Sequence, residues 1–494
     1  MHKLLIFFRS KPFFLLLLPL FFVFHGFTEN FNAIPAFAAL SLAGVYIAAS
    51  LIIFFTGWLC YRNISKAAIL SFCIMAFHFF FGTIQDTLKK LFGEIFFTRY
   101  VFLLPFILSV FIIIIIGLKK SKSSFTKLSL FLNTLLCLLI VMDAAWLVQR
   151  SFSKNNSPFS KYIPVVNCDT CTKPDIYLLL FDEYSSSTAL KELWSFDNNG
   201  LDSFLLKKGF SIQSLSRSNY NFTEFSMASA LNMDYLSIPD PKACTIKDYN
   251  QCFDLIRKNQ VCEFLESIGY RIVNNSIFDL SKNPSPVTED FLPLKTKLIT
   301  SQTFLSRLQK DLYYHLLVGK FAIPFLAKNL VYRTGHNNEK IINATMKESV
   351  QPSPFPRFIY SHIEMPHPPF YYTGNGKQTN MKKLIEESKN LTPSSYLAYI
   401  PRTNEVIKQL VNSIINNAKR PVVIILLGDH GFRTQQPEIY HFRNQNAVYF
   451  SFTDQNKFYP AISNVNEFRV LFNTLFQTSY PLLKDSAIYL TDKK

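Results

Sequence analysis

Five long apolar stretches in the first third of the chain limit what it can fold into. Each is close to the length that a helix needs to cross a bilayer. The first follows Lys3, Arg9 and Lys11, as a signal peptide would, but its run is long and no small-residue cleavage pattern follows it. We therefore interpret it as a retained helix and predict a five-helix transmembrane domain over residues 1–149. The expected spans are residues 12–27, 37–60, 67–84, 100–117 and 125–147.

The short loops between these stretches differ in charge. Loops on one side carry mostly Lys and Arg, whereas the loops on the other side carry Glu29 or a mixture of signs. The positive-inside rule places the N-terminus in the cytoplasm, and five crossings place everything after about residue 150 outside. We expect a multi-pass protein of the cell (inner) membrane with an exported C-terminal domain. The basic residues are Lys3, Arg9, Lys11, Arg62, Lys66, Lys119, Lys120, Lys122 and Lys127.

The formal net charge of +17 is spread along the chain. No basic run is interleaved with aromatic residues, so the pattern does not favour binding to nucleic acid. A basic surface facing anionic lipid or a polyanionic envelope polymer fits better.

Five cysteines would lie outside the cytoplasm, where disulfides form. Cys168 with Cys171, and Cys244 with Cys252, would each close a short loop and leave Cys262 over. Half of a zinc site is the alternative for Cys168 and Cys171, but no second pair accompanies them.

Residues 150–172 are polar and broken by proline, as in a linker, and residues 173–494 alternate strand-like and helix-like stretches. This alternation predicts an α/β domain with a mostly parallel sheet flanked by helices. Within it, the apolar run 176–181 ends in Asp182 and Glu183. Two adjacent carboxylates at the end of a buried strand repel each other unless a cation compensates them. Acidic residues at a helix start are the alternative interpretation.

A second buried strand, residues 421–427, ends in Gly-Asp-His-Gly. Asp429 and His430 thus emerge at the end of a central strand, where open α/β sheets place their ligands. A hard oxygen beside an imidazole nitrogen suits zinc or manganese. A turn with a capping Asp is the alternative.

Thr223 precedes a helical pattern and is expected at its N-cap. A hydroxyl there faces the positive end of the helix and, beside a metal, could lose its proton and attack phosphorus or sulfur. An ordinary capping threonine is the other possibility. His362 lies within a predicted strand, as core histidines do, whereas His367 stands in a rigid proline turn and His441 precedes a further strand. The turn histidine is better placed to contact a substrate oxygen or leaving group.

Together, Ile-Tyr-Leu-Leu-Leu-Phe-Asp-Glu, the hydroxyl at a helix start, the histidine segment and Leu-Gly-Asp-His-Gly resemble the sulfatase-like branch of the alkaline phosphatase superfamily over residues 174–452. With its membrane helices the chain resembles lipoteichoic acid synthases and phosphoethanolamine or phosphoglycerol transferases. The resemblance implies Thr223 as nucleophile, with Ser226 and Ser229 as alternatives, and His367 and His441 as aids to phosphate binding or leaving-group protonation. It implies a divalent metal, zinc or manganese first with calcium or magnesium as alternatives, held by Asp182, Glu183, Thr223, Asp429 and His430.

The sequence departs from the formylglycine sulfatases, because Asn-Phe-Thr-Glu-Phe-Ser around Thr223 lacks their Cys and Arg. The resemblance therefore implies a transferase that moves a phospho-alkanol group, phosphoethanolamine or phosphoglycerol, from a membrane phospholipid to an envelope glycan or lipid through a phosphothreonine. A phosphoester or sulfoester hydrolase is the first alternative. A membrane-tethered binding protein with a degenerate site is the second.

Overall fold

The computed structural model describes residues 11–31, 34–93, 95–152, 171–287, 296–309, 331–373, 376–389, 391–434, 437–452 and 457–492. The chain divides into two compact units. The first unit contains residues 1–155 and 290–322, and the second contains residues 156–289 and 323–494. Most of the predicted linker, residues 153–170, lies outside the described part of the chain.

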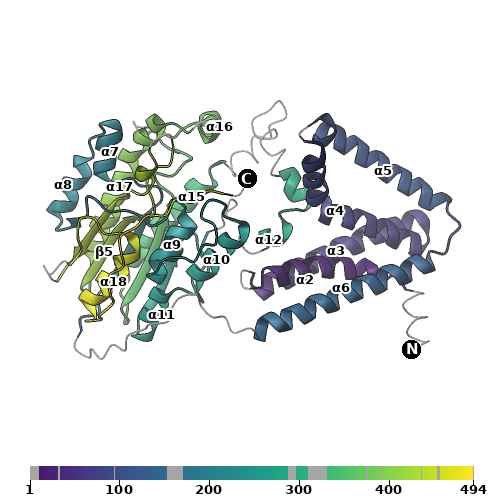
Figure 1. Cartoon of the computed structure of the whole chain (residues 1–494), viewed down its shortest axis with the longest axis horizontal. Coiled ribbons are helices and arrows are strands. Elements are labelled where there is room, and N and C mark those ends of the chain that lie inside the picture. Colours follow the sequence, from purple (N-terminus) through teal and green to yellow (C-terminus); the bar gives the residue numbers. More distant parts are fainter. Residues whose placement is uncertain are drawn as a thin grey trace. The chain divides into compact units, whose positions relative to one another are not determined.

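The first unit is a bundle of apolar helices (Figure 1). Four of them are long and apolar enough to cross a membrane, which corrects the expected count of five. The helix formed from the first predicted span has only 16 residues, about 24 Å at 1.5 Å per residue, against a hydrocarbon core of about 30 Å. The helices are α2 (Phe14–Glu29), α3 (Ala36–Tyr61), α4 (Ile64–Phe92), α5 (Tyr100–Lys120) and α6 (Thr126–Phe152), with the short 3-10 helix η1 (Phe96–Thr98) before α5.

The short helix α2 packs against α3, α4 and α6. Its first backbone N–H, that of Phe14, donates to Asn133 Oδ1 at 2.6 Å, and the Asn133 amide donates to the Lys11 carbonyl at 2.8 Å. Near the other end of α2, His25 Nδ1 lies 3.0 Å from Asp143 Oδ1. Since Asn133 comes before Asp143 along α6, the two helices run parallel.

A segment from the middle of the sequence returns to this bundle. Helix α12 (Lys297–Thr300) places Ile299 in an apolar cluster with Val23 and residues of α3. The Gly82 N–H donates to the Gln302 carbonyl at 2.8 Å, and Phe304 lies 5.0 Å, between ring centroids, from Phe77. Nothing in the local sequence of residues 296–309 indicates this return.

The second unit is built on a six-stranded sheet of order β2-β6-β5-β1-β4-β3. Neighbouring strands β3, β4, β1 and β5 are parallel, and β6 is antiparallel to β5 and β2. Every residue of β1, β4 and β5 is buried, as predicted for β1 and β5 from their uncharged runs. The strands are β1 (Asp175–Phe181), β2 (Ser211–Ile212), β3 (Arg271–Asn275), β4 (Arg357–Ile363), β5 (Val422–Gly428) and β6 (Asn446–Phe450).

Helices cover this sheet in two sets (Figure 1). In one set α9, α10, α11 and α18 pack together, and in the other α15 packs on α17 and β4. The helices are α7 (Ser187–Trp194), α8 (Asn199–Lys207), α9 (Thr223–Asn232), α10 (Ile246–Arg257), α11 (Gln260–Ser267), α15 (Arg333–Val350), α16 (Met381–Lys389), α17 (Pro393–Asn417) and α18 (Asn464–Leu475), with the 3-10 helix η2 (Glu438–His441). This confirms the predicted mostly parallel α/β domain.

The cysteine prediction is wrong in one part. Cys244, Cys252 and Cys262 are all buried free thiols, so no bridge joins Cys244 to Cys252. Burial raises the pKa of the Cys252 thiol well above its ordinary value, and a buried, protonated thiol is a small apolar side chain. Cys171 is disulfide-bonded, and its expected partner Cys168 lies outside the described residues.

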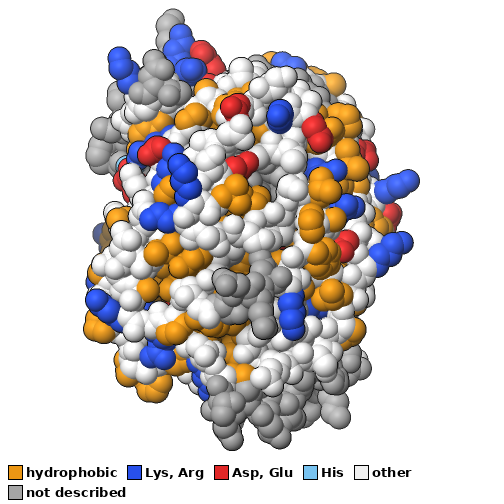
Figure 2. All heavy atoms as spheres, turned by 90° about the vertical axis from the view of Figure 1, so that its left-hand side faces the viewer, with side chains coloured by type: hydrophobic (Ala, Val, Ile, Leu, Met, Phe, Trp, Pro, Cys, Tyr) orange, Lys and Arg blue, Asp and Glu red, His pale blue; other side chains and the backbone are white. Residues whose placement is uncertain are grey.

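Charge is scattered on the face shown in Figure 2. There Lys and Arg side chains stand singly among hydrophobic and uncharged polar ones, with a few Asp and Glu between them. This face carries no basic stripe among the residues that the structure describes.

Candidate metal and phosphoester site

The site lies at the carboxyl ends of the two central strands. Asp182 follows β1 and Asp429 follows β5, and the pairing of Phe181 with Gly428 brings these two residues to the same level. Gly428 is required there, since a Cβ atom at this position would lie 2.6 Å from the Tyr184 carbonyl oxygen. The parallel pairing of buried strands therefore brings two carboxylates together.

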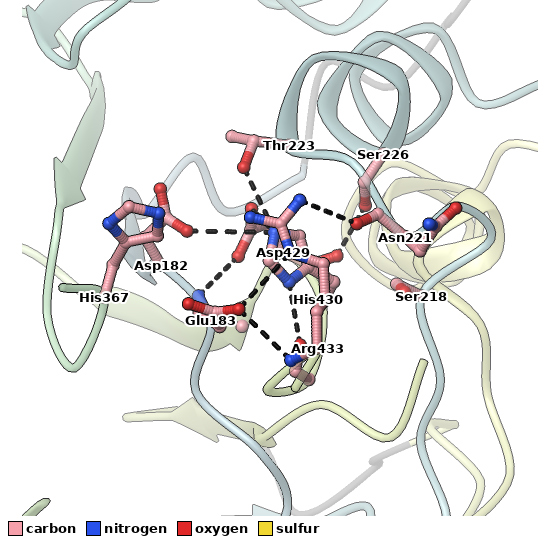
Figure 3. Close-up of polar contacts among 12 residues, drawn as sticks. Asp182, Glu183, Ser218, Asn221, Thr223, Ser226, His367, Asp429, His430 and Arg433 are labelled. Atoms are coloured by element: carbon pink, nitrogen blue, oxygen red, sulfur yellow. Dashed lines mark hydrogen bonds and ion pairs between the residues drawn. The ribbon is translucent and has the colours of Figure 1, made fainter. Parts of the chain in front are cut away.

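Asp182, Asp429 and His430, which we call the metal group, are fully buried, and their potential ligand atoms lie within 4.8 Å of one another. His430 Nε2 is 3.2 Å from Asp429 Oδ2 and 3.9 Å from Asp182 Oδ1. Figure 3 shows these side chains together, with Thr223 directed toward them from the start of α9.

The hydrogen bonds show that this group fits a cation. His430 Nδ1 lies 2.9 Å from the Gly431 carbonyl, which can only accept, so Nδ1 carries the proton and the neutral ring turns its Nε2 lone pair to the carboxylates. Asp182 Oδ1 and Asp429 Oδ2 are buried and have no hydrogen-bond donor among the described residues. Apart from the Thr223 hydroxyl at Nε2, no hydrogen-bond donor among the described residues reaches these three electron-pair donors, and a divalent cation would satisfy all three.

The pKa shifts follow from the same crowding. Burial and the neighbouring Asp182 raise the pKa of Asp429 to about 6. Burial also favours the neutral form of Asp182, but His367 and His362 beside it hold its pKa below the ordinary value. Burial and the nearby Arg433 lower the pKa of His430 to about 4, which keeps its ring neutral.

Thr223 is the first residue of α9, and Phe222 is the N-cap, which corrects the expected capping role of Thr223. Its Oγ1 lies 3.2 Å from His430 Nε2, and its side chain is partly exposed. The hydroxyls of the two alternative nucleophiles, Ser226 and Ser229, are both buried, and each already donates a hydrogen bond to a backbone carbonyl. Ser226 donates to the Asp429 carbonyl at 2.6 Å, and Ser229 donates to the Asp234 carbonyl at 2.6 Å. Thr223 is therefore the hydroxyl that the fold presents to the group of three.

Glu183 lies outside that group. Its φ of +62° places it in the left-handed region, which non-glycine residues adopt at a cost. Its N–H donates to Asp429 Oδ1 at 2.9 Å, and its carboxylate accepts from the N–H and the Nε–H of Arg433, both at 3.2 Å. Arg433 also donates to the Asn221 carbonyl at 3.2 Å and lies over the Phe222 ring. The sharp turn thus directs Asp182 to the metal group and Glu183 to an arginine.

The predicted histidines are placed differently from one another. His367 lies beside Asp182 (Figure 3), with Nδ1 donating to the Pro368 carbonyl at 2.6 Å, which leaves Nε2 for a ligand. His441 is buried under Tyr489, and neither ring nitrogen has a hydrogen-bond partner among the described residues. Burial, Arg433 and His430 lower the pKa of His441 to about 4, so its ring is neutral.

Sequence reasoning missed three residues of this neighbourhood. His362, interpreted as a core residue, holds Asp182: its Nε2 donates to Asp182 Oδ2 at 3.2 Å, while Nδ1 lies 3.1 Å from the Tyr360 hydroxyl. Arg433 could have been found as the first cation after Asp-His-Gly. Glu224 follows Thr223, and burial raises its pKa to about 7; nothing in its local pattern distinguishes it from an ordinary acid in a first helical turn.

Comparison with known proteins gives a family match for this domain. Residues 279–467 match the model of the Sulfatase family. No curated protein matches the sequence.

Similar solved structures include the C-terminal periplasmic domain of EcEptC from Escherichia coli (12% identity, 66% of this chain and 88% of that one, TM-score 0.35). The periplasmic domain of phosphoethanolamine transferase EptC from Campylobacter jejuni is 16% identical over 63% of this chain and 92% of that one, with a TM-score of 0.34. The soluble domain of lipooligosaccharide phosphoethanolamine transferase A from Neisseria meningitidis is 12% identical over 66% of this chain and 92% of that one, with a TM-score of 0.36.

Proposed function

Because residues 279–467 match the Sulfatase family model and four apolar helices are long enough to cross a membrane, we propose that this chain is a membrane-anchored, metal-dependent transferase. It takes a phospho-alkanol group, phosphoethanolamine or phosphoglycerol, from a membrane phospholipid and transfers it to an envelope glycan. The enzyme resides in the inner membrane with its second unit outside the cytoplasm. This placement takes the short helix α2, which runs parallel to α6, as a fifth crossing. The observation that carries the proposal is the Thr223 hydroxyl, 3.2 Å from His430 Nε2 beside two buried carboxylate oxygens without a donor.

Asp182, Asp429, His430 and Thr223 would hold the metal, and their mixture of oxygen and nitrogen donors favours zinc or manganese. Once bound, a divalent cation there lowers the pKa of the threonine hydroxyl and offsets negative charge on the phosphoryl oxygens. Glu183 serves by orienting Arg433, whose guanidinium has further N–H groups for a phosphoryl oxygen.

In the first half-reaction, Thr223 Oγ1, which has given its proton to solvent, bonds to phosphorus while the bond from phosphorus to the lipid oxygen breaks. His367, protonated at Nε2, gives that oxygen its proton. In the second half-reaction His367 Nε2 takes the proton of a glycan hydroxyl, whose oxygen attacks phosphorus while the bond from phosphorus to Thr223 Oγ1 breaks and the threonine alkoxide is released. Water in place of the glycan would make the enzyme a hydrolase.

The test is to trap the intermediate on the full-length protein in detergent. Wild type and Thr223→Ala are incubated with phosphatidylethanolamine, phosphatidylglycerol and Zn²⁺ or Mn²⁺, quenched in acid and mapped by peptide mass. We expect an adduct on the peptide that contains Thr223 in wild type and none in Thr223→Ala. The mass of the adduct would identify the transferred group.

The matched control is Thr245→Ala, which removes another threonine at a helix start, the N-cap of α10. This variant should form the adduct as wild type does. Equal ester cleavage by wild type and Thr223→Ala, with no adduct in either, would contradict the assignment. An adduct that decays to free phosphoethanolamine or phosphoglycerol with glycan present would favour the hydrolase.

A further inference from the structure

A pocket opens in the second unit, and none of the residues that line it belongs to the metal group. Its cavity volume of about 80 Å³ is below the range of about 300–1,000 Å³ usual for sites that enclose a small molecule, so a ligand would lie against its wall rather than inside it. Four tyrosines dominate its wall, and charged and amide side chains stand among them. The tyrosines are Tyr332, Tyr371, Tyr372 and Tyr399.

The tyrosine rings are held in place by their neighbours. The Tyr332 hydroxyl donates to the Thr379 carbonyl at 2.9 Å, and the Tyr371 hydroxyl donates to the Val331 carbonyl at 3.0 Å. The rings of Tyr372 and Tyr399 are parallel to within 8°. Because these rings are already oriented, a ligand would meet preformed aromatic surfaces and lose less free energy in ordering them.

Arg402 supplies an unused donor at this pocket. Its guanidinium carbon lies 5.0 Å from the centroid of the Tyr372 ring, which fixes the plane of the group. Its Nε is buried and has no hydrogen-bond partner among the described residues. A buried N–H without an acceptor is destabilising, and a ligand oxygen would provide the missing acceptor. Glu339, on the same wall, offers an acceptor for hydroxyl groups.

The pocket shares its walls with the metal site. The loop after β4 contributes Met365, Tyr371 and Tyr372 to the pocket, and the same loop carries His367 to Asp182. Helix α17 contributes Tyr399, and one turn earlier the Tyr396 hydroxyl donates to the Glu183 carbonyl at 2.9 Å. The pocket and the metal site are thus built from the same loop and the same helix.

We propose that the pocket binds one sugar ring of the carbohydrate that the enzyme modifies, with an acidic group of that sugar on Arg402. Flat aromatic faces beside polar side chains suit a sugar, which has apolar C–H faces and hydroxyl groups around its edge. An acyl chain would leave Arg402 and Glu339 buried without partners. The inference deepens the proposed function and rests on it for the class of substrate.

The test measures sugar binding directly on full-length protein carrying Thr223→Ala, so that no turnover occurs. Trigalacturonic acid is the acidic probe and maltotriose the neutral one, each followed by saturation-transfer NMR up to about 10 mM. We expect saturable binding of both, with the acidic probe bound about tenfold more tightly. Arg402→Ala should remove that preference, and Tyr372→Ala should weaken both probes about tenfold.

Two further variants separate ligand contact from damage to the fold. Tyr372→Phe keeps the ring and should keep binding, and Lys408→Ala removes a partly exposed cation of α17 and should change nothing. Absence of saturable binding by both probes, or equal binding by Tyr372→Ala, would overturn the proposal, as would saturation only by short-chain phosphatidylethanolamine. Because the parent lacks Thr223, failure of the covalent mechanism leaves this outcome unaffected.

Discussion

The ion pair between Glu183 and Arg433 is expected to affect both catalysis and stability, and these two effects can be separated by mutation. The Glu183 carboxylate is 4% exposed and Arg433 is 28% exposed, so the pair is largely removed from solvent. We predict that Arg433→Ala lowers phosphoester turnover about 100-fold, through loss of a donor to the phosphoryl oxygens, and lowers the free energy of unfolding by about 2–4 kcal/mol. Steady-state kinetics and urea unfolding measure the two effects.

The double variant Arg433→Ala with Glu183→Gln distinguishes the two roles. It removes the unpaired buried charge and should recover most of the stability without recovering turnover. Recovery of turnover in the double variant would mean that Arg433 acts only by neutralising Glu183.

Glu467 is a buried acid away from the metal group. It is 0% exposed, its Oε2 accepts from Asn446 Nδ2 at 2.9 Å, and burial raises its pKa from the ordinary 4.5 to about 7. The folded state thus binds this proton more tightly than the unfolded state does. The free energy of unfolding should be highest below pH 4.5 on account of this group and fall by about 3 kcal/mol as pH rises to about 7.

Urea unfolding across this pH range compares wild type with Glu467→Gln, which should lose that part of the pH dependence. Glu405→Gln, an exposed acid of α17, is the control and should retain the wild-type slope. An unchanged slope in Glu467→Gln would contradict a neutral Glu467 in the fold.

At the scale of elements, the strands that form the site were predictable, but the hydrogen-bond and ion-pair partners of the site residues were not. Uncharged runs ending in Asp182 and in Asp429 identified β1 and β5, because strands covered on both faces need apolar residues throughout. Strand β3 has a mixed pattern of burial and gave no such indication. The role of His362 depends on which strand pairs with β1, and the partner of Glu183 depends on a positive φ; neither is visible in local sequence.

For the membrane helices too, the sequence predicted which segments are helical but not how they pack. Hydropathy located all five helices, but the length of α2 and its position among the others come from packing. Asn133 is fully buried, and its side chain hydrogen-bonds to the backbone at the start of α2. We predict that Asn133→Leu lowers the free energy of unfolding in detergent by about 1 kcal/mol, since two hydrogen bonds to backbone are lost in an apolar surrounding.

Thermal unfolding in detergent measures this change. Leu135→Ala, at a partly exposed position of the same helix, is the control. Equal effects of the two substitutions would mean that the hydrogen bonds of Asn133 contribute nothing beyond its size.

At the scale of the whole molecule, the chain passes between its two units more than once. Residues 290–322 belong to the helical unit although they lie inside the sequence of the second one. We predict that cleavage at a protease site engineered within residues 153–170 leaves the fragment 171–494 with the membrane after a carbonate wash. The reason is that Ile299 and Phe304 remain packed among helices of the bundle.

Sedimentation of the cleaved protein measures this retention. Phe304→Asp together with Arg307→Ala should release the fragment, because these changes remove the aromatic contacts with Phe77 and Phe81 and the ion pair with Asp86. Release of the wild-type fragment by the single cut would contradict the packing described here.

The returning segment also sets an order of events during synthesis. Strand β1 pairs with β4 and β5, and both of these strands come after residue 322. The helices of the bundle and residues 296–309 are therefore all made before the central strand has either neighbour. A nascent chain can dock this segment first and so hold residues 171–287 at both ends while the strands that complete the sheet are still being added.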